Sequence, residues 1–332
     1  MVFIWTAIFF LSVFVLVKGA DFLISSAEKI GLSMGFSPFI IGVTIVGLGT
    51  SFPELITSFV AAFKGAQEII VANAVGSNIV NILLVVGLSA IVGRKLVVTK
   101  SLIDIDLPLL AIGTVLFLGI VFDKEITIGE SFLMVITYGG YLLYTAFHRE
   151  EDDDKEEEEF SGILPSRQTR RKEKVSLKNE ARPKVSYKDF LILFAGIVSL
   201  LLGAKYLIDS LVELSKILNI APSIIAVTAV SLGTSLPELI VSVKAALKKK
   251  AELALGNIFG SNVFNMFIVV GLPGLFFSLT VEDQIYTIGI PTMALATLLF
   301  VISGISRKIH MWEGAFYLSL YVLFIAKLFN WF

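Results

Sequence analysis

A polar hexapeptide occurs twice in this chain of 332 residues, each time inside strongly apolar sequence. The first copy is Gly-Thr-Ser-Phe-Pro-Glu at 49–54, and the second is Gly-Thr-Ser-Leu-Pro-Glu at 233–238. Other residues recur at the same separation of 184 positions (238 − 54 = 184), namely Pro38 and Pro222, Gly76 and Gly260, and Asn81 and Asn265. A constant offset over such a long stretch indicates a duplicated unit, so the chain must fold as two related halves.

The composition places both halves in a membrane. Hydrophobic residues make up 56% of the chain and charged residues 17%, which is far more apolar than soluble domains. A helix needs about 20 apolar residues to cross the hydrocarbon core. Ten such runs are expected at 2–17, 37–62, 69–92, 102–121, 127–147, 188–212, 222–246, 251–275, 283–304 and 311–330.

Five spans on each side of one hydrophilic segment give three regions. They are a first five-helix repeat at 1–147 with its motif at 38–81, a charged loop at 148–187, and a second repeat at 188–332 with its motif at 222–265. Because each half has an odd number of spans, the halves must be inserted upside down relative to each other. The predicted fold is an all-α polytopic membrane protein of ten transmembrane helices in two inverted-topology repeats, an architecture typical of secondary transporters.

Lysine and arginine predict the orientation, because they accumulate in cytoplasmic loops. One set of loops contains Arg94, Lys95, the basic residues of 148–187, and Lys248 to Lys250, whereas the opposite loops contain few. We therefore expect both termini outside the cell membrane and the loop 148–187 in the cytoplasm. The absence of cysteine excludes disulfides and thiolate metal sites.

The loop begins with an almost unbroken acidic run from Glu150 to Glu159, followed by basic residues. Such a segment buries too little apolar surface to fold and is usually a solvated linker. A regulatory Ca²⁺ sensor is the alternative, although a selective Ca²⁺ site normally holds its carboxylates in a shaped loop.

Glu54 and Glu238 differ from the other acidic residues because each lies deep within a predicted span. A carboxylate at the centre of a membrane helix costs about 2.5–3.5 kcal/mol on insertion scales. No deep basic residue is available as a partner except Lys205. A bound cation is therefore the expected compensation.

The neighbouring residues supply oxygen ligands for a cation. Pro53 and Pro237 lack an N–H and are expected to kink their helices and to free carbonyls near Gly49 and Gly233. A spacing of four puts each threonine on the same helix face as its glutamate, and each serine of the following span on the face of an asparagine. The set comprises Thr50, Thr234, Ser77, Ser261, Asn81 and Asn265. These hard oxygen donors suit Ca²⁺ or Na⁺ better than Mg²⁺, which demands a tighter octahedral shell.

Charge balance predicts antiport, because two ionised glutamates neutralise one Ca²⁺ and Na⁺ ions can replace it at the same ligands. Ca²⁺ and Na⁺ are then substrates, with no cofactor, nucleic acid or obligate protein partner beyond the lipid bilayer. A passive cation channel would lack Na⁺-driven uphill movement of Ca²⁺. An intramembrane hydrolase would need a general base, and no histidine or lysine accompanies both hexapeptides.

With these motifs the sequence resembles the cation/calcium antiporter superfamily, and within it the prokaryotic sodium/calcium exchangers. The two alpha repeats, Pro38 to Asn81 and Pro222 to Asn265, carry the resemblance. It implies that Glu54 and Glu238 are ligands shared by Ca²⁺ and Na⁺, with hydroxyl oxygens from Thr50, Ser51, Thr234, Ser235, Ser77 and Ser261, and Na⁺-binding carbonyls at Gly47 and Ser231. It also implies that the first and sixth spans, around 2–29 and 188–216, slide across the core.

The sequence departs from the family pattern in informative places. Relatives commonly have alanine at the positions of Gly47 and Ser231, where carbonyl ligation tolerates the change. Potassium-dependent relatives have aspartate at the position of Asn265, so asparagine there resembles the potassium-independent type.

The alternative function is Ca²⁺/H⁺ exchange, because a desolvated glutamate can bind a proton. Its hallmark asparagine is replaced here by Thr50 and Thr234.

Overall fold

Among the described residues, helices lie within each of the ten spans that the sequence predicts. The computed structural model describes residues 2–63, 65, 67–97, 106–147, 183–217, 233–329 and 331. The helical segments of the first half are α1 (Val2–Ser33), α2 (Pro38–Ile41), η1 (Gly42–Val46), α3 (Gly47–Thr50), α4 (Phe52–Phe63), α5 (Glu68–Ile79), η2 (Val80–Val86), α6 (Gly87–Gly93), α7 (Leu107–Ile120), η4 (Val121–Asp123) and α8 (Ile128–Phe147). Those of the second half are α11 (Tyr187–Ile217), α13 (Leu236–Leu247), α14 (Ala251–Phe264), η5 (Asn265–Val269), α15 (Gly271–Gly274), η6 (Ile285–Gly289), α16 (Ile290–Ile305) and α17 (Met311–Leu328).

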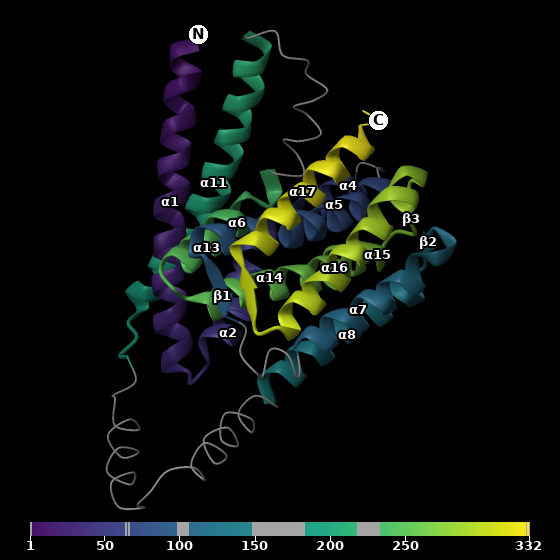
Figure 1. Ribbon diagram of the computed structural model, residues 1–332, viewed down its shortest axis with the longest axis horizontal. Coiled ribbons are helices and arrows are strands. Elements are labelled where there is room, and N and C mark those ends of the chain that lie inside the picture. Colours follow the sequence, from purple (N-terminus) through teal and green to yellow (C-terminus); the bar gives the residue numbers. More distant parts are fainter. Residues whose placement is uncertain are drawn as a thin grey trace, which may run out of the picture.

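α1 is longer than the span predicted at 2–17, because nothing interrupts the helix before Gly35. That glycine has a φ of +86° and ends the helix, with the Phe36 amide donating back to the Gly31 carbonyl at 2.9 Å. The second half of α1 buries Leu23, Ile24 and Ala27 against the core. α1 and α11 pack side by side along their length, and α1 also contacts α2, η1 and α13. In Figure 1 the part of α1 near the N-terminus and the adjoining part of α11 extend beyond the other helices.

The centre of the molecule is formed by the repeated motifs. In α14, every residue from Leu253 to Phe264 is buried. Glycines allow this helix to contact the backbone of α2 and η1: a Cβ atom on Gly260 would lie 2.3 Å from the Val43 carbonyl oxygen of η1, and one on Gly256 would lie 2.4 Å from the Phe39 carbonyl oxygen of α2. The remaining helices surround this centre and present exposed leucine, isoleucine and phenylalanine side chains outward. Such exposure is expected of a protein surrounded by lipid.

Two short sheets each pair a strand of the first half with a strand of the second half. β1 (Lys95–Val97) pairs antiparallel with β4 (Lys308–His310), and β2 (Glu125–Ile126) pairs antiparallel with β3 (Leu279–Thr280). Leu279 is the repeat equivalent of Lys95 (279 − 95 = 184), and Ile309 is that of Glu125 (309 − 125 = 184). Each sheet thus joins one strand from each half, and the two sheets correspond under the repeat.

Ion pairs connect α1 to the second half at one end of the molecule. The Asp21 carboxylate lies 2.6 Å from the Lys244 ammonium and 2.8 Å from that of Lys248, while Glu28 pairs with Lys250. Lys29 of α1 pairs with Asp189 of α11 at 2.8 Å. Lys244 within α13, and Lys248 and Lys250 directly after it, thus pair with carboxylates of α1.

Candidate functional site

Each hexapeptide interrupts a helix at its serine. α3 ends at Thr50, Ser51 has φ −88° and ψ 6°, and α4 starts at Phe52 with its axis bent by 40°. Ser235 has nearly the same dihedrals, φ −88° and ψ 5°, at the start of α13. Proline explains the break, because it has no N–H to donate to the carbonyl four residues back and it fits the first turn of a new helix.

This break corrects one expectation from the sequence. Thr50 and Glu54 do not share the face of one continuous helix, because Thr50 ends α3 and Glu54 lies in the first turn of α4. Glu238 occupies the same place in α13. Each carboxylate is therefore at the amino end of a helix, where the macrodipole favours negative charge.

The two glutamates are fully buried and hydrogen-bonded across the repeat boundary. The Ser51 hydroxyl donates to Glu238 Oε1 at 2.8 Å, and the Ser235 hydroxyl donates to Glu54 Oε1 at 3.4 Å. The Thr234 hydroxyl also interacts with the Glu54 carboxylate, and the two carboxylates repel each other electrostatically. The other carboxylate oxygen of each glutamate is buried and has no hydrogen-bond partner among the residues that the structure describes. The inverted repeats thus bring both predicted carboxylates to one site.

The polar residues of the following span are buried in the same core. Ser77 and Asn81 lie in α5 and η2, and Ser261 and Asn265 lie at the corresponding places in α14 and η5. All four side chains are 0% exposed. Among the described residues, the Ser77 hydroxyl and the carboxamides of Asn81 and Asn265 have no hydrogen-bond partner, and the Ser261 hydroxyl lies near the Glu238 carboxylate. Both asparagines lie in π-helical turns, which occur frequently at functional sites. The buried oxygens around the glutamates therefore include several that protein groups leave unsatisfied.

The remaining predicted ligands are Thr50, Gly47 and Ser231. The Thr50 hydroxyl lies 3.1 Å from Asn257 Oδ1 and 3.3 Å from the Gly47 carbonyl, which also accepts from the Ser51 amide at 3.1 Å. The Gly47 carbonyl, expected as a Na⁺ ligand, is thus already hydrogen-bonded. Ser231 lies outside the described residues.

Two further asparagines contact the glutamates, and the sequence argument missed both. The Asn73 carboxamide donates to the Glu54 carbonyl at 3.4 Å, and that of Asn257 donates to the Glu238 carbonyl at 3.5 Å. The two asparagines are separated by the repeat offset (257 − 73 = 184), as are Ser58 and Ser242. A search for every polar pair at that offset would have found them.

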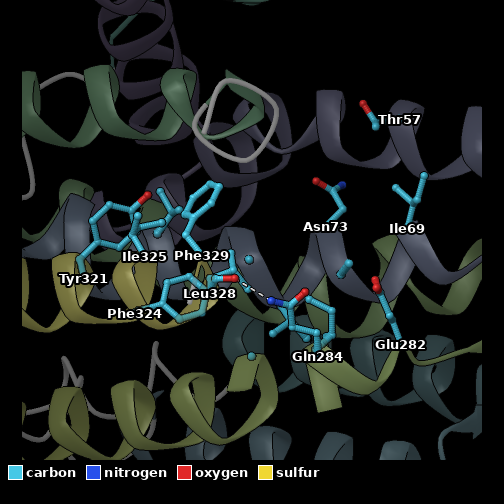
Figure 2. Close-up of a pocket in the computed structure, with 16 residues that line it drawn as sticks. Thr57, Ile69, Asn73, Glu282, Gln284, Tyr321, Phe324, Ile325, Leu328 and Phe329 are labelled. Carbon is cyan, nitrogen blue, oxygen red and sulfur yellow. Dashed lines mark hydrogen bonds between the residues drawn. The ribbon is translucent and has the colours of Figure 1, made fainter. Parts of the chain in front are cut away.

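A cavity of about 450 Å³ reaches the Asn73 side of the site (Figure 2). Its walls are mostly apolar side chains of α5, η6 and α17, and its polar lining includes Thr57, Asn73, Glu282, Gln284 and Tyr321. The Gln284 carboxamide is held by the Leu328 carbonyl at 2.6 Å. Asn73 is half-buried at the edge of this space, whereas its counterpart Asn257 is 0% exposed. The two sides of the site thus differ in access.

The donor set limits the chemistry of this site. Among the described residues, no group of three or more histidine, cysteine, aspartate or glutamate side chains is placed to hold a metal ion. The site instead combines two carboxylates with neutral hydroxyl and carboxamide oxygens, which is the chemistry of Ca²⁺ and alkali cations rather than of transition metals.

Comparisons with known proteins agree with the repeat and the fold. The model of the family described as "Sodium/calcium exchanger protein" matches residues 4–147 and 188–330. The sodium/calcium exchanger MaX1 of Methanosarcina acetivorans is 33% identical over 95% of each chain. The inner membrane protein YrbG of Escherichia coli is 28% identical over 90% of this chain and 87% of its own.

A solved structure extends the match over the whole length. The sodium-calcium exchanger NCX_Mj, soaked with zero Na⁺ and Ca²⁺, superposes with a TM-score of 0.77 and 29% identity over 99% of this chain and 100% of its own. The predicted fold class is confirmed by this match, as is the expectation of a transporter rather than an enzyme. The chain is an integral membrane protein with the ten-helix inverted-repeat fold, and it belongs to the sodium/calcium exchanger family.

Proposed function

We propose that this protein exchanges Na⁺ for Ca²⁺ by alternating access at one shared site between the hexapeptides. The observation that carries the proposal is a set of buried oxygens that have no hydrogen-bond partner in the part of the chain that the structure describes, one on each of Glu54 and Glu238 and others on Ser77, Asn81 and Asn265. Buried polar groups are normally satisfied, and a buried carboxylate needs a compensating charge. A cation coordinated by these oxygens supplies both.

The charge of the site explains why the two ions would alternate. One Ca²⁺ neutralises both carboxylates, and two Na⁺ provide the same charge. Filling the site with both ions at once would leave excess positive charge in a low-dielectric core. If more than two Na⁺ replace one Ca²⁺, each cycle moves net charge and responds to membrane potential, by about 2.3 kcal/mol per charge per 100 mV.

We assign the site ligands by their places in the two repeats. Glu54 and Glu238 bind both ions, and Thr50, Ser51, Thr234, Ser235, Ser77, Ser261, Asn81 and Asn265 contribute oxygens, with the carbonyls of Gly47 and Ser231 as Na⁺ ligands. The cross-repeat hydrogen bonds of Ser51 and Ser235 support this assignment, because they draw ligands from both halves together. A movement of one half relative to the other would consequently change the distances between these ligands.

The proposed function is tested by ⁴⁵Ca²⁺ uptake into proteoliposomes that are loaded with Na⁺ and diluted into Na⁺-free buffer. Uptake that requires the outward Na⁺ gradient and persists when pH gradients are collapsed is the expected result. Uptake driven only by a pH gradient would instead establish the Ca²⁺/H⁺ alternative. Downhill Ca²⁺ flux without coupling to either gradient would indicate a channel.

External K⁺ is expected to have no effect on this uptake. The Asn265 carboxamide is neutral, so the buried site has the two charges of the glutamates and no third carboxylate to hold an additional cation. Initial rates in K⁺-containing and K⁺-free buffer should therefore agree within about twofold. The loss of one ion contact would change the rate by a clearly larger factor. Uptake that disappears without K⁺ would contradict this interpretation of Asn265.

We further propose the three-region division and the orientation predicted above, with residues 148–187 in the cytoplasm and both termini outside. The chain has no cysteine, so single cysteines report topology without a background. A membrane-impermeant maleimide should label Glu125→Cys on intact cells, and Ser161→Cys only after permeabilisation. The reverse labelling pattern would invert the assignment.

A further inference from the structure

Asn257 lies in the middle of α14, completely buried between the two halves of the site. Its carboxamide nitrogen donates to the Ser242 hydroxyl at 2.8 Å and to the Glu238 carbonyl at 3.5 Å. Its carboxamide oxygen lies 3.1 Å from the Thr50 hydroxyl. One side chain thus connects the glutamate of the second repeat with the threonine of the first.

The chemistry of these partners determines which way the carboxamide points. A backbone carbonyl can only accept a hydrogen bond, so the Glu238 carbonyl requires the nitrogen of Asn257 on its side. The carboxamide oxygen then faces Thr50, and this oxygen can also only accept. The Thr50 hydroxyl must therefore be the donor in that contact.

The second neighbour of the Thr50 hydroxyl reinforces this direction. The Gly47 carbonyl, 3.3 Å away, is again an acceptor without a hydrogen to give. The Glu238 carboxylate lies near the same hydroxyl, but the acceptors with hydrogen-bond geometry are Asn257 Oδ1 and the Gly47 carbonyl. The single hydroxyl hydrogen is thus directed toward these two acceptors, and the lone pairs of the Thr50 oxygen are directed away from both. Lone pairs are what a hydroxyl presents to a cation.

We propose that Asn257 is a positioning residue that orients the Thr50 hydroxyl so that its lone pairs face the transported ion. The inference rests on the proposed function, because it takes Thr50 to be an ion ligand. Burial makes the role specific: water can reach the half-buried Asn73 from the cavity in Figure 2, whereas Asn257 is 0% exposed. Solvent therefore cannot replace the Asn257 oxygen as the acceptor.

A double-mutant cycle in the full-length protein tests whether Asn257 acts through Thr50. Wild type, Asn257→Leu, Thr50→Val and the double variant are reconstituted, and the KM for Ca²⁺ and the kcat of Na⁺-driven uptake are measured. Each single substitution should raise the KM for Ca²⁺ roughly tenfold, the scale of one lost buried hydrogen bond. In the Thr50→Val background, Asn257→Leu should add less than about a twofold change, because no hydroxyl remains to be oriented.

Thr114→Val is the matched control for a change inside the core. Thr114 is 4% exposed in α7, and its hydroxyl donates to the Leu110 carbonyl of its own helix at 2.8 Å. Its substitution should leave the KM for Ca²⁺ unchanged. If Asn257→Leu does not give monodisperse protein, Asn257→Ala takes its place in the cycle, since it removes the same acceptor without adding bulk.

Additive effects of the two substitutions on KM would overturn the inference, because they would show that Asn257 does not act through Thr50. An unchanged KM in the single Asn257 variant would also overturn it. Neither outcome affects the proposed function, which is decided by Na⁺-driven uptake of the wild-type protein in the same preparation.

Discussion

Replacement of Glu54 or Glu238 by glutamine is expected to reduce Na⁺-driven Ca²⁺ uptake by at least roughly 100-fold. Glutamine keeps the size of the side chain and one acceptor oxygen but removes the charge, which leaves a buried divalent ion with a single compensating carboxylate. Breaking a buried charge pair typically costs about 3–5 kcal/mol, which corresponds to roughly 150- to 5,000-fold in binding. The repeat symmetry places both glutamates at equivalent positions, so we expect a severe loss in both variants.

Folding must be separated from transport in this experiment. In ion-free buffer the two buried carboxylates repel each other, so removing one charge should not lower the unfolding temperature of the purified protein. Glu125→Gln is the control, because this carboxylate is exposed on β2 and lies outside the site. Near-normal Na⁺-dependent flux in either site variant would refute the shared-site proposal.

The positions of the spans, their repetition and the pairing of the glutamates could all be predicted from the sequence. Membrane helices are set by the length of apolar runs, which is a local property. A constant offset relates the two hexapeptides, and inverted insertion then requires the halves to meet. The expectation that Glu54 and Glu238 approach each other needed no knowledge of individual contacts.

The local geometry of the site could not be predicted in the same way. A proline within an apolar run predicts a kink in one continuous helix, whereas in the structure α3 ends at Thr50, a new helix starts at Phe52, and Ser51 lies between the two. That choice depends on the tertiary partner of Ser51, the Glu238 carboxylate of the other repeat. The contact joins residues 187 positions apart (238 − 51 = 187), and no local pattern reports it.

The roles of Asn73 and Asn257 were missed for a related reason. Each asparagine follows its glutamate by 19 positions and contacts the backbone of that glutamate, not its side chain. A search for cation ligands considers side-chain oxygens around the carboxylates and overlooks groups that hold the backbone. The close approach of α14 to η1 was equally hidden, because a glycine in the sequence does not show which backbone it contacts.

That close approach gives the second prediction with a large effect: Gly260→Val is expected to prevent formation of the native core. Even the first added carbon would lie 2.3 Å from the Val43 carbonyl oxygen and 2.8 Å from the Val43 Cα atom. Both are backbone atoms, so no side-chain rotation can relieve the clash, and α14 must move away from η1. Overpacking of a core costs typically 1–3 kcal/mol, and a clash with backbone should reach at least the upper end, roughly 3 kcal/mol.

Transport should be lost even in protein that remains folded, because α14 carries Asn257 and Ser261 on either side of Gly260. Ligand oxygens bind Ca²⁺ within a range of only about 0.3 Å, so a displacement of the helix separates them from the ligands of the first half. Gly140→Val is the matched control: Gly140 lies in α8, and an added Cβ there meets nothing within 4 Å. The unfolding temperature and Na⁺-driven uptake should stay near wild type for Gly140→Val and fall for Gly260→Val. Equal behaviour of the two variants would mean that the contact between α14 and η1 does not determine the geometry of the site.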